Sequence, residues 1–143
     1  MHIAELTKKL QLLAVKHDVW PSSVDETTLG AMLFDAAQTI PVDQDVSERI
    51  ATEALHRWIG GNGSMLRYDA VELRRLLVDW QFIKRDGFGR AYRRCTEAPQ
   101  RFAMVCALSL QIDFRALIAD ARATERQRRD ARKAAHMATQ IAA

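Results

Sequence analysis

The chain has 143 residues, of which 48% are hydrophobic and 27% are charged, so it is long enough for one domain with a buried core. It contains no run of about 18 apolar residues, which argues against a membrane-spanning helix and a membrane partner. The first residues mix acids and bases with leucines, unlike a signal peptide, and we therefore expect a cytoplasmic protein.

The charges are divided unevenly along the chain, although the net charge is only +3. Residues 1–60 hold five Lys/Arg and nine Asp/Glu, whereas residues 67–94 and residues 101–133 each hold eight Lys/Arg and four Asp/Glu. An acidic front half followed by two basic blocks indicates a surface for a polyanion, most often nucleic acid. A solvated basic surface without a partner is the alternative.

Apolar residues at helical spacing predict four helices in the first 80 residues. These helices span residues 4–17, 26–40, 46–59 and 69–80. Pro21 follows the first helix and Pro41 ends the second. Asp25, Ser47 and Asp69 are the expected N-caps of the other three. The stretch GGNGS at 60–64 stops the third helix.

Two short strand-like runs follow the fourth helix. FIKRD and RAYRRC flank the turn GFG, whose glycines permit a tight reversal, and this pattern predicts a hairpin. Phe82, Ile83 and Tyr92 are expected to face a core while the positive groups face water. The apolar run after Pro99 predicts a buried helix broken near 109–113, and the arginine- and alanine-rich tail extends a helix past the core.

The fragments LRRLLVDW, QFIKRDGFG and RAYRR carry a resemblance to a known fold. Residues 46–95 resemble the winged helix-turn-helix superfamily, and more narrowly a bacterial winged-helix domain family of unassigned function that occurs in transcriptional regulators. The resemblance implies a mainly α fold with a small β-hairpin, in which a winged helix-turn-helix core gains an N-terminal helix and a C-terminal helical extension. The turn GGNGSMLRY departs from the pattern by its length, with Met65 or Leu66 as the expected apolar pivot.

Three segments follow from this interpretation. Residues 1–45 contribute helices that complete the core, residues 46–96 form the winged-helix domain, and residues 97–143 form a helical extension that offers a route to a homodimer. The basic block at 122–133 has three possible roles that the sequence does not distinguish: a solvated helix face, a nucleic-acid clamp or a dimerisation helix. Phe114, Leu117, Ile118 and Ala121 would lie at the buried end of a dimerisation helix.

The expected function is duplex DNA binding, because a helix fits the major groove and a basic hairpin beside it reaches phosphates. The fourth helix is expected to turn Leu73, Leu76, Leu77 and Trp80 inward and to hold Arg74 at its flank. The candidate contacts are Arg67, Tyr68, Arg74, Arg75, Lys84, Arg85, Arg90, Arg93 and Arg94. The alternative for each arginine is a structural role, such as pairing with a nearby acid or packing its stem on the hairpin.

Catalytic and metal-binding patterns are absent from the sequence, which gives no nucleophile elbow, phosphate loop or Cys/His cluster. We therefore expect no enzyme and no cofactor. Cys95 and Cys106 are expected to be reduced, partly buried thiols. The leading hypothesis is a transcriptional regulator. A protein-docking module that uses the acidic front half, and an RNA- or ribosome-associated protein, are the alternatives.

Overall fold

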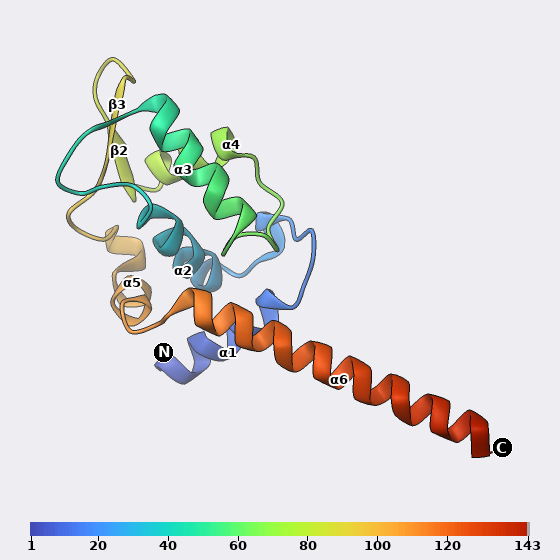
Figure 1. The fold of residues 1–143 in the computed structure, drawn as a ribbon. Helices are drawn as coiled ribbons and strands as arrows, with labels where there is room; N and C mark the ends of the chain where they lie inside the picture. Colours follow the sequence, from blue (N-terminus) through green and yellow to red (C-terminus); the bar gives the residue numbers. More distant parts are fainter. Residues whose placement is uncertain (143) are drawn as a thin grey trace.

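A computed structural model of the chain describes residues 1–142 and shows a helical body from which one long helix projects (Figure 1). The helices are α1 (Ile3–Ala14), α2 (Glu26–Ala37), α3 (Glu48–Gly60), α4 (Ala70–Asp79), α5 (Ala103–Ser109) and α6 (Phe114–Ala142). The strands are β1 (Val46–Ser47), β2 (Ile83–Arg85) and β3 (Ala91–Arg94), and short 3₁₀ turns lie at Pro21–Ser23 and Gln100–Phe102. The predicted fold class, mainly α with a small hairpin, is confirmed.

The predicted N-caps fix where three helices begin. The Asp25 carboxylate accepts a hydrogen bond from the Thr28 backbone N–H, Ser47 Oγ accepts one from Ile50, and Asp69 accepts one from Glu72. Each bond satisfies a backbone donor that the first helical turn leaves free. Partial burial opposes ionisation of Asp25, but hydrogen bonds from Thr28 and the charge of Lys9 outweigh it and lower the pKa of that carboxyl.

The sheet has one strand more than the sequence predicted. β2 and β3 form the expected antiparallel hairpin, with Lys84 opposite Arg93 and Arg85 opposite Tyr92. Residues 46 and 47 were expected at the start of a helix with Ser47 as its N-cap. Ser47 does cap α3, but Val46 also pairs with Tyr92 and Ser47 with Ala91, so the strand order is β1-β3-β2. Two residues are too short to show a strand period, and only the neighbouring hairpin makes β1 a strand.

One hydrophobic core joins the front and rear of the chain. Leu6 of α1, Leu33 of α2, Leu55 of α3 and Leu77 of α4 are each fully buried in it, as is the base of the hairpin through Ile83. Phe82 and Tyr92 are buried as expected. α1 and α2 therefore complete the core around α3 and α4, while the division of the chain into three segments stays a prediction.

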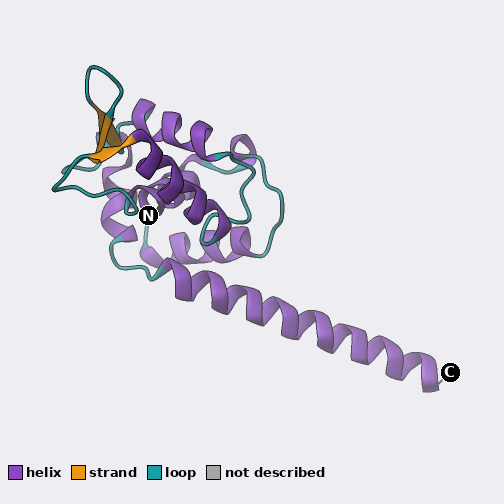
Figure 2. Cartoon of the chain, turned by 45° about the horizontal axis from the view of Figure 1, so that its top comes forward, coloured by secondary structure: helices purple, strands orange, loops and turns teal. Residues whose placement is uncertain are grey.

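The C-terminal part breaks where the sequence predicted. α5 ends at Ser109 and α6 begins at Phe114. Phe114 and Ile118 are buried on the body, whereas every described residue beyond Glu125 is exposed. Figure 2 shows this outer part of α6 leaving the body without a neighbouring element.

The loop between α3 and α4 is held firmly despite its glycines. Trp58 Nε1 and Asn62 Nδ2 both donate hydrogen bonds of 2.8 Å to one carboxylate oxygen of Asp35, and Gly63 lies directly over the Trp58 ring. Met65 and Leu66, the two candidate pivots, are both buried. This long turn is therefore a packed connection that fixes α4 against α3.

We expect Gly63→Ala to destabilise the protein by about 1–3 kcal/mol, the usual range for overpacking. A Cβ at residue 63 would lie 2.3 Å from Cζ3 of Trp58, whose ring is buried and held by the hydrogen bond from its Nε1 to Asp35. Gly60→Ala is the matched control, because a Cβ there meets nothing within 4 Å. Urea unfolding followed by tryptophan fluorescence measures both, and equal midpoints for the two variants would contradict the packing argument.

Candidate nucleic-acid interface

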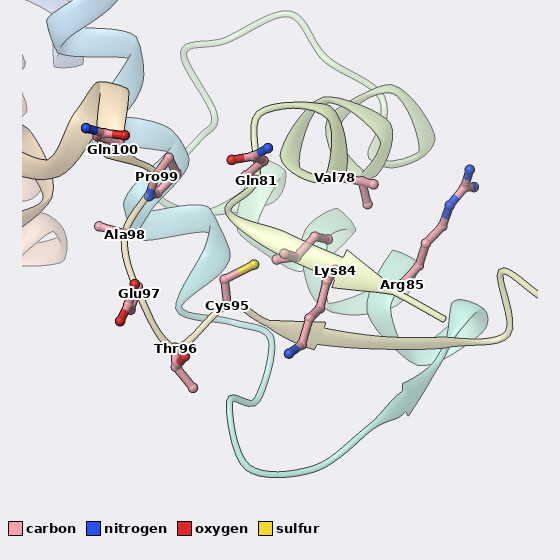
Figure 3. A pocket seen from close by; sticks show the side chains of 11 residues that line it. Val78, Gln81, Lys84, Arg85, Cys95, Thr96, Glu97, Ala98, Pro99 and Gln100 are labelled. Carbon is pink, nitrogen blue, oxygen red and sulfur yellow. The ribbon is translucent and has the colours of Figure 1, made fainter. Parts of the chain in front are cut away.

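The hairpin stands beside the C-terminal end of α4 and presents cations on two faces. Because side chains alternate along a strand, Ile83 and Arg85 share a face with Tyr92 and Arg94, and Lys84 shares the other with Arg93. Figure 3 shows Lys84 and Arg85 leaving β2 in different directions. Like charges directly opposite each other, as at Lys84 and Arg93, destabilise a sheet and raise the positive potential of that face.

A groove separates α4 from the hairpin and contains cations from both. Its volume is 210 Å³, and it is lined by Arg75 and Asp79 of α4 and by Arg85 of β2, with Tyr92 beneath. Arg75 and Arg85 are exposed. Neither takes part in an ion pair within residues 1–142, including the alternative pairing of Arg75 with Asp79. Two guanidinium groups facing one narrow groove are suited to a phosphate, because each offers several N–H donors.

A second hollow adjoins this groove and shares Val78 and Arg85 with it. It has a volume of 560 Å³ and is bounded by Lys84, by Gln81 in the turn after α4, and by the segment from Cys95 to Gln100 (Figure 3). Glu97 is the acid in this lining. Burial raises the pKa of the Cys95 thiol although nearby Lys84 opposes the shift, so Cys95 is protonated at neutral pH and is a poor nucleophile.

The loop of the hairpin is fixed by an aspartate. The Asp86 carboxylate accepts a 2.8 Å hydrogen bond from the backbone N–H of Arg90, and this bond, with others from the loop backbone, lowers the pKa of Asp86. Gly89 has a φ of +68°, in the left-handed region that glycine adopts without strain. Arg90 is therefore held at the rim of the hairpin, and its side chain is exposed.

Sequence reasoning missed the residue at the tip of the hairpin. Phe88 lies between Gly87 and Gly89 and is 84% exposed, the highest value among the exposed large hydrophobic residues described. The available signal was an aromatic residue between two glycines in a turn, where no neighbour can cover it. Apolar side chains at such positions insert between base steps in several minor-groove binding proteins.

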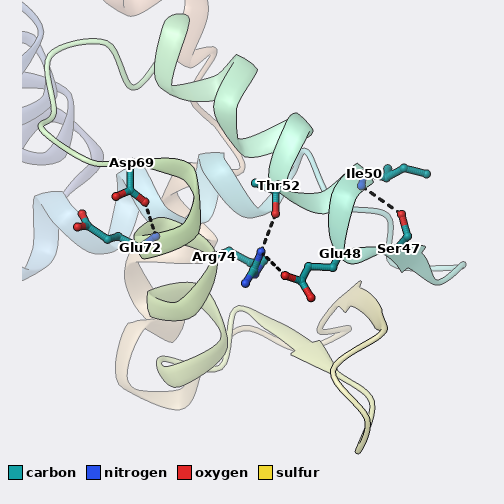
Figure 4. Close-up of polar contacts among 7 residues, drawn as sticks. All are labelled: Ser47, Glu48, Ile50, Thr52, Asp69, Glu72 and Arg74. Atoms are coloured by element: carbon teal, nitrogen blue, oxygen red, sulfur yellow. Dashed lines mark hydrogen bonds and ion pairs between the residues drawn. The ribbon is translucent and has the colours of Figure 1, made fainter.

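Arg74 does not lie where the sequence placed it. The side chain was expected at the exposed flank of α4, but the residue is only 7% exposed. Its Nη1 lies 3.2 Å from Glu48 Oε1 and donates a 2.7 Å hydrogen bond to Thr52 Oγ1, both on α3 (Figure 4). Its guanidinium carbon lies 5.4 Å from the centroid of the Tyr92 ring. These contacts give Arg74 a structural position beneath the groove.

Two arginines of β3 are also engaged within the chain. Arg93 Nε donates a 2.8 Å hydrogen bond to Asp45, and Arg94 donates one to Gln38. Both arginines are half-buried. Asp45 and Glu48 were not predicted to belong to this surface, because nothing local in the sequence brings the segment before α3 to the hairpin. Contacts by acids from the front half reduce the positive charge available here.

Arg67 and Tyr68 precede the first residue of α4, whereas the hairpin follows the last residue of that helix. Arg67 lies 4.4 Å from the Trp20 ring centroid and 3.6 Å from the Asp18 carboxylate. Burial, with a contribution from Glu72, raises the pKa of Tyr68 to about 12. The cations that the structure brings together at the hairpin, exposed and outside every ion pair described, are Arg75, Lys84, Arg85 and Arg90.

The described residues offer few groups for metal binding or for thiol chemistry. No cluster of three or more His, Cys, Asp or Glu in residues 1–142 is arranged to hold a metal ion. Burial raises the pKa of Cys106 to about 11. Across the same residues no single helix is long and apolar enough to cross a membrane, although Gln100–Ser109 and α6, bent by 68° relative to each other, together have the length and composition.

The fold and this surface define a mainly helical domain with a basic hairpin beside its fourth helix. The chain belongs to a bacterial family described as an uncharacterized protein conserved in bacteria (DUF2087), whose model matches residues 19–94, just over half of the chain. The match includes α2, α3, α4 and all three strands, and leaves out α1, α5 and α6. Comparison with curated proteins gives no match. Comparison with solved structures gives none either.

We expect mutation of Arg74 to destabilise the protein and mutation of its neighbour Arg75 to leave its stability nearly unchanged. Arg74→Ala should lower the free energy of unfolding by about 2 kcal/mol, because it removes a charged hydrogen bond and leaves a gap above Tyr92. Arg75→Ala should change it by less than about 0.5 kcal/mol, as is usual for an exposed side chain. Urea unfolding measures both, and equal losses would mean that Arg74 is not the structural arginine.

Proposed function

We propose that this protein is a DNA-binding protein with a winged helix-turn-helix core, acting as a bacterial transcriptional regulator without catalytic activity. In this proposal α4 approaches the major groove and the β2–β3 hairpin contacts the flanking phosphates. The observation that carries it is the groove in which Arg75 of α4 and Arg85 of β2, both exposed and unpaired, face the same 210 Å³ space.

The order of the elements supports the proposal. Three helices, α2, α3 and α4, are followed directly by a hairpin whose first strand begins beside the end of α4, as the winged-helix resemblance implies. α4 is short, with ten residues, and its exposed face holds Glu72, Arg75 and Asp79. The two acids on that face would repel phosphates, so the cations of the hairpin supply most of the attraction in this proposal.

The tip of the hairpin suggests a finer role. Phe88 is exposed between its flanking glycines at the tip of the hairpin, two residues before the exposed Arg90. A minor groove attracts cations and accepts apolar wedges at flexible base steps. We therefore assign Phe88 to contact the bases in the minor groove, in addition to the phosphate contacts of the cations.

The test neutralises the hairpin cations without disturbing the core. A variant with Lys84→Gln, Arg85→Gln and Arg90→Gln should bind a mixed-sequence duplex more weakly. Its plot of log affinity against log salt should be less steep by about 2 to 3, because each lost phosphate contact removes about 0.9 from the slope. Its melting temperature should stay close to that of the wild type, because all three side chains are exposed and unpaired.

A charge-matched control carries Lys8→Gln, Arg57→Gln and Arg115→Gln, three exposed residues on α1, α3 and α6. It should keep the wild-type salt slope. If both variants bind DNA more weakly by the same factor, the loss comes from the lower net charge of the protein, and the assignment of the hairpin as the binding surface is wrong. Tighter binding to single-stranded RNA in the same titration would favour the RNA-associated alternative, and no retention on heparin would favour a protein-docking module.

A further inference from the structure

The outer half of α6 is exposed, and only its first turn, through Arg126, Arg128 and Arg129, lines hollows beside the C-terminal half of α1. From Arg126 to Ala142 every residue is exposed, and at 1.5 Å per residue this segment extends about 25 Å from the body. Its root is anchored by Arg122, which donates hydrogen bonds to the Ala14 carbonyl and to Ser64 Oγ. Figures 1 and 2 both show the segment pointing away from every other element.

Local sequence alone keeps this segment helical. It has no glycine or proline and is rich in alanine, arginine and glutamine, which have high helix propensity. No apolar burial repays the entropy of ordering it, in contrast to the root, where Phe114 and Ile118 enter the core. A helix that extends so far without covering core presents a surface of its own.

The charge of this segment is strongly one-sided. Residues 126–142 hold five Lys/Arg and one acid, Asp130. With 3.6 residues per turn, the five cations fall within a sector of about 160°, whereas Ala131, Ala134 and Ala138 fall on the opposite side. The one ion pair described for these cations joins Arg132 to Glu125. Arg126, Arg128, Arg129 and Lys133 thus form an unneutralised ridge, which we call the α6 ridge.

The shape and charge of the ridge favour nucleic acid over the other partners that such a helix can take. A membrane surface requires a strongly apolar opposite face, but that face is mostly alanine, with Met137 and Ile141 near its end. A second copy of the helix would bring two cationic segments together across a short alanine stripe, which buries little area. Closely spaced cations on one side of an exposed helix suit the regularly spaced phosphates of a nucleic-acid strand.

We propose that the α6 ridge is a second nucleic-acid binding surface, which contacts a segment different from the one under the hairpin. The hairpin and the tip of α6 lie at opposite ends of the molecule (Figure 1), so one straight stretch of duplex cannot lie along both. The protein therefore bridges two nucleic-acid segments. The second contact rests on its own residues, and the bridging rests also on the proposed function of the hairpin.

The first test measures the ridge alone. Full-length protein with Arg126→Gln, Arg129→Gln and Lys133→Gln keeps good helix formers at exposed positions, so its helix content by circular dichroism should be unchanged. Its salt slope for duplex DNA should fall by about 2 to 3. The Lys8, Arg57 and Arg115 variant described above controls for net charge, and Ala131→Gln with Ala134→Gln controls for the opposite face. Both controls should keep the wild-type slope.

The second test measures bridging. A biotinylated duplex on beads should retain a second, fluorescent duplex in the presence of wild-type protein. Either the hairpin variant or the ridge variant should abolish that retention while still binding single duplexes. Retention that survives in the ridge variant would overturn the bridging role of α6.

The outcomes separate the two proposals. If the ridge variant keeps the wild-type salt slope while the hairpin variant loses slope, the ridge proposal is wrong and the hairpin proposal stands. If the hairpin variant keeps the wild-type salt slope while the ridge variant loses slope, the hairpin proposal is wrong and the ridge proposal is supported. If neither variant changes the slope, neither surface binds DNA. Binding of an acidic polypeptide such as polyglutamate as tightly as DNA at equal salt would overturn nucleic acid as the partner of the ridge.

Discussion

One buried guanidinium fixes the geometry on which the candidate interface depends. Arg74 extends from α4, bonds Glu48 and Thr52 on α3, and lies over Tyr92 of β3, so it connects two helices and the hairpin. A charge with so little access to water is stable only when its donors are paired, which restricts the separation and rotation of these elements. Arg75, the next residue, is directed to the open side and faces Arg85 across the groove.

The structure explains part of the uneven distribution of charge along the sequence. Acids from the front half contact cations from the rear half, as Asp45 contacts Arg93 and Glu26 contacts Arg101. Most of these pairs are exposed, so each contributes little to stability in water. Their larger effect is on the surface potential, because they remove charge from some basic positions and leave it at others. Several unpaired cations lie together at the hairpin and several more on the outer half of α6.

These two cationic ends are built in opposite ways. The hairpin depends on tertiary packing, since Ile83 and Tyr92 anchor it in the core and Asp86 orders its loop through backbone hydrogen bonds. The outer half of α6 depends on local helix propensity and on continuity with a buried root. The hairpin lies within the region that the family model matches, and α6 lies outside it. A contact surface at the hairpin would thus belong to the family unit, and one on α6 would be an addition to it.

The sequence by itself determined the features that are local. The caps at Asp25, Ser47 and Asp69, the hairpin around its glycines and the break after Ser109 follow from spacing and turn chemistry within a few residues. Only the tertiary structure decided that Arg74 is buried, that residues 46 and 47 form a strand, and that Asp45 meets Arg93. Each of these joins residues distant in the chain, and periodicity carries no information about which distant partner a side chain meets once the helices pack.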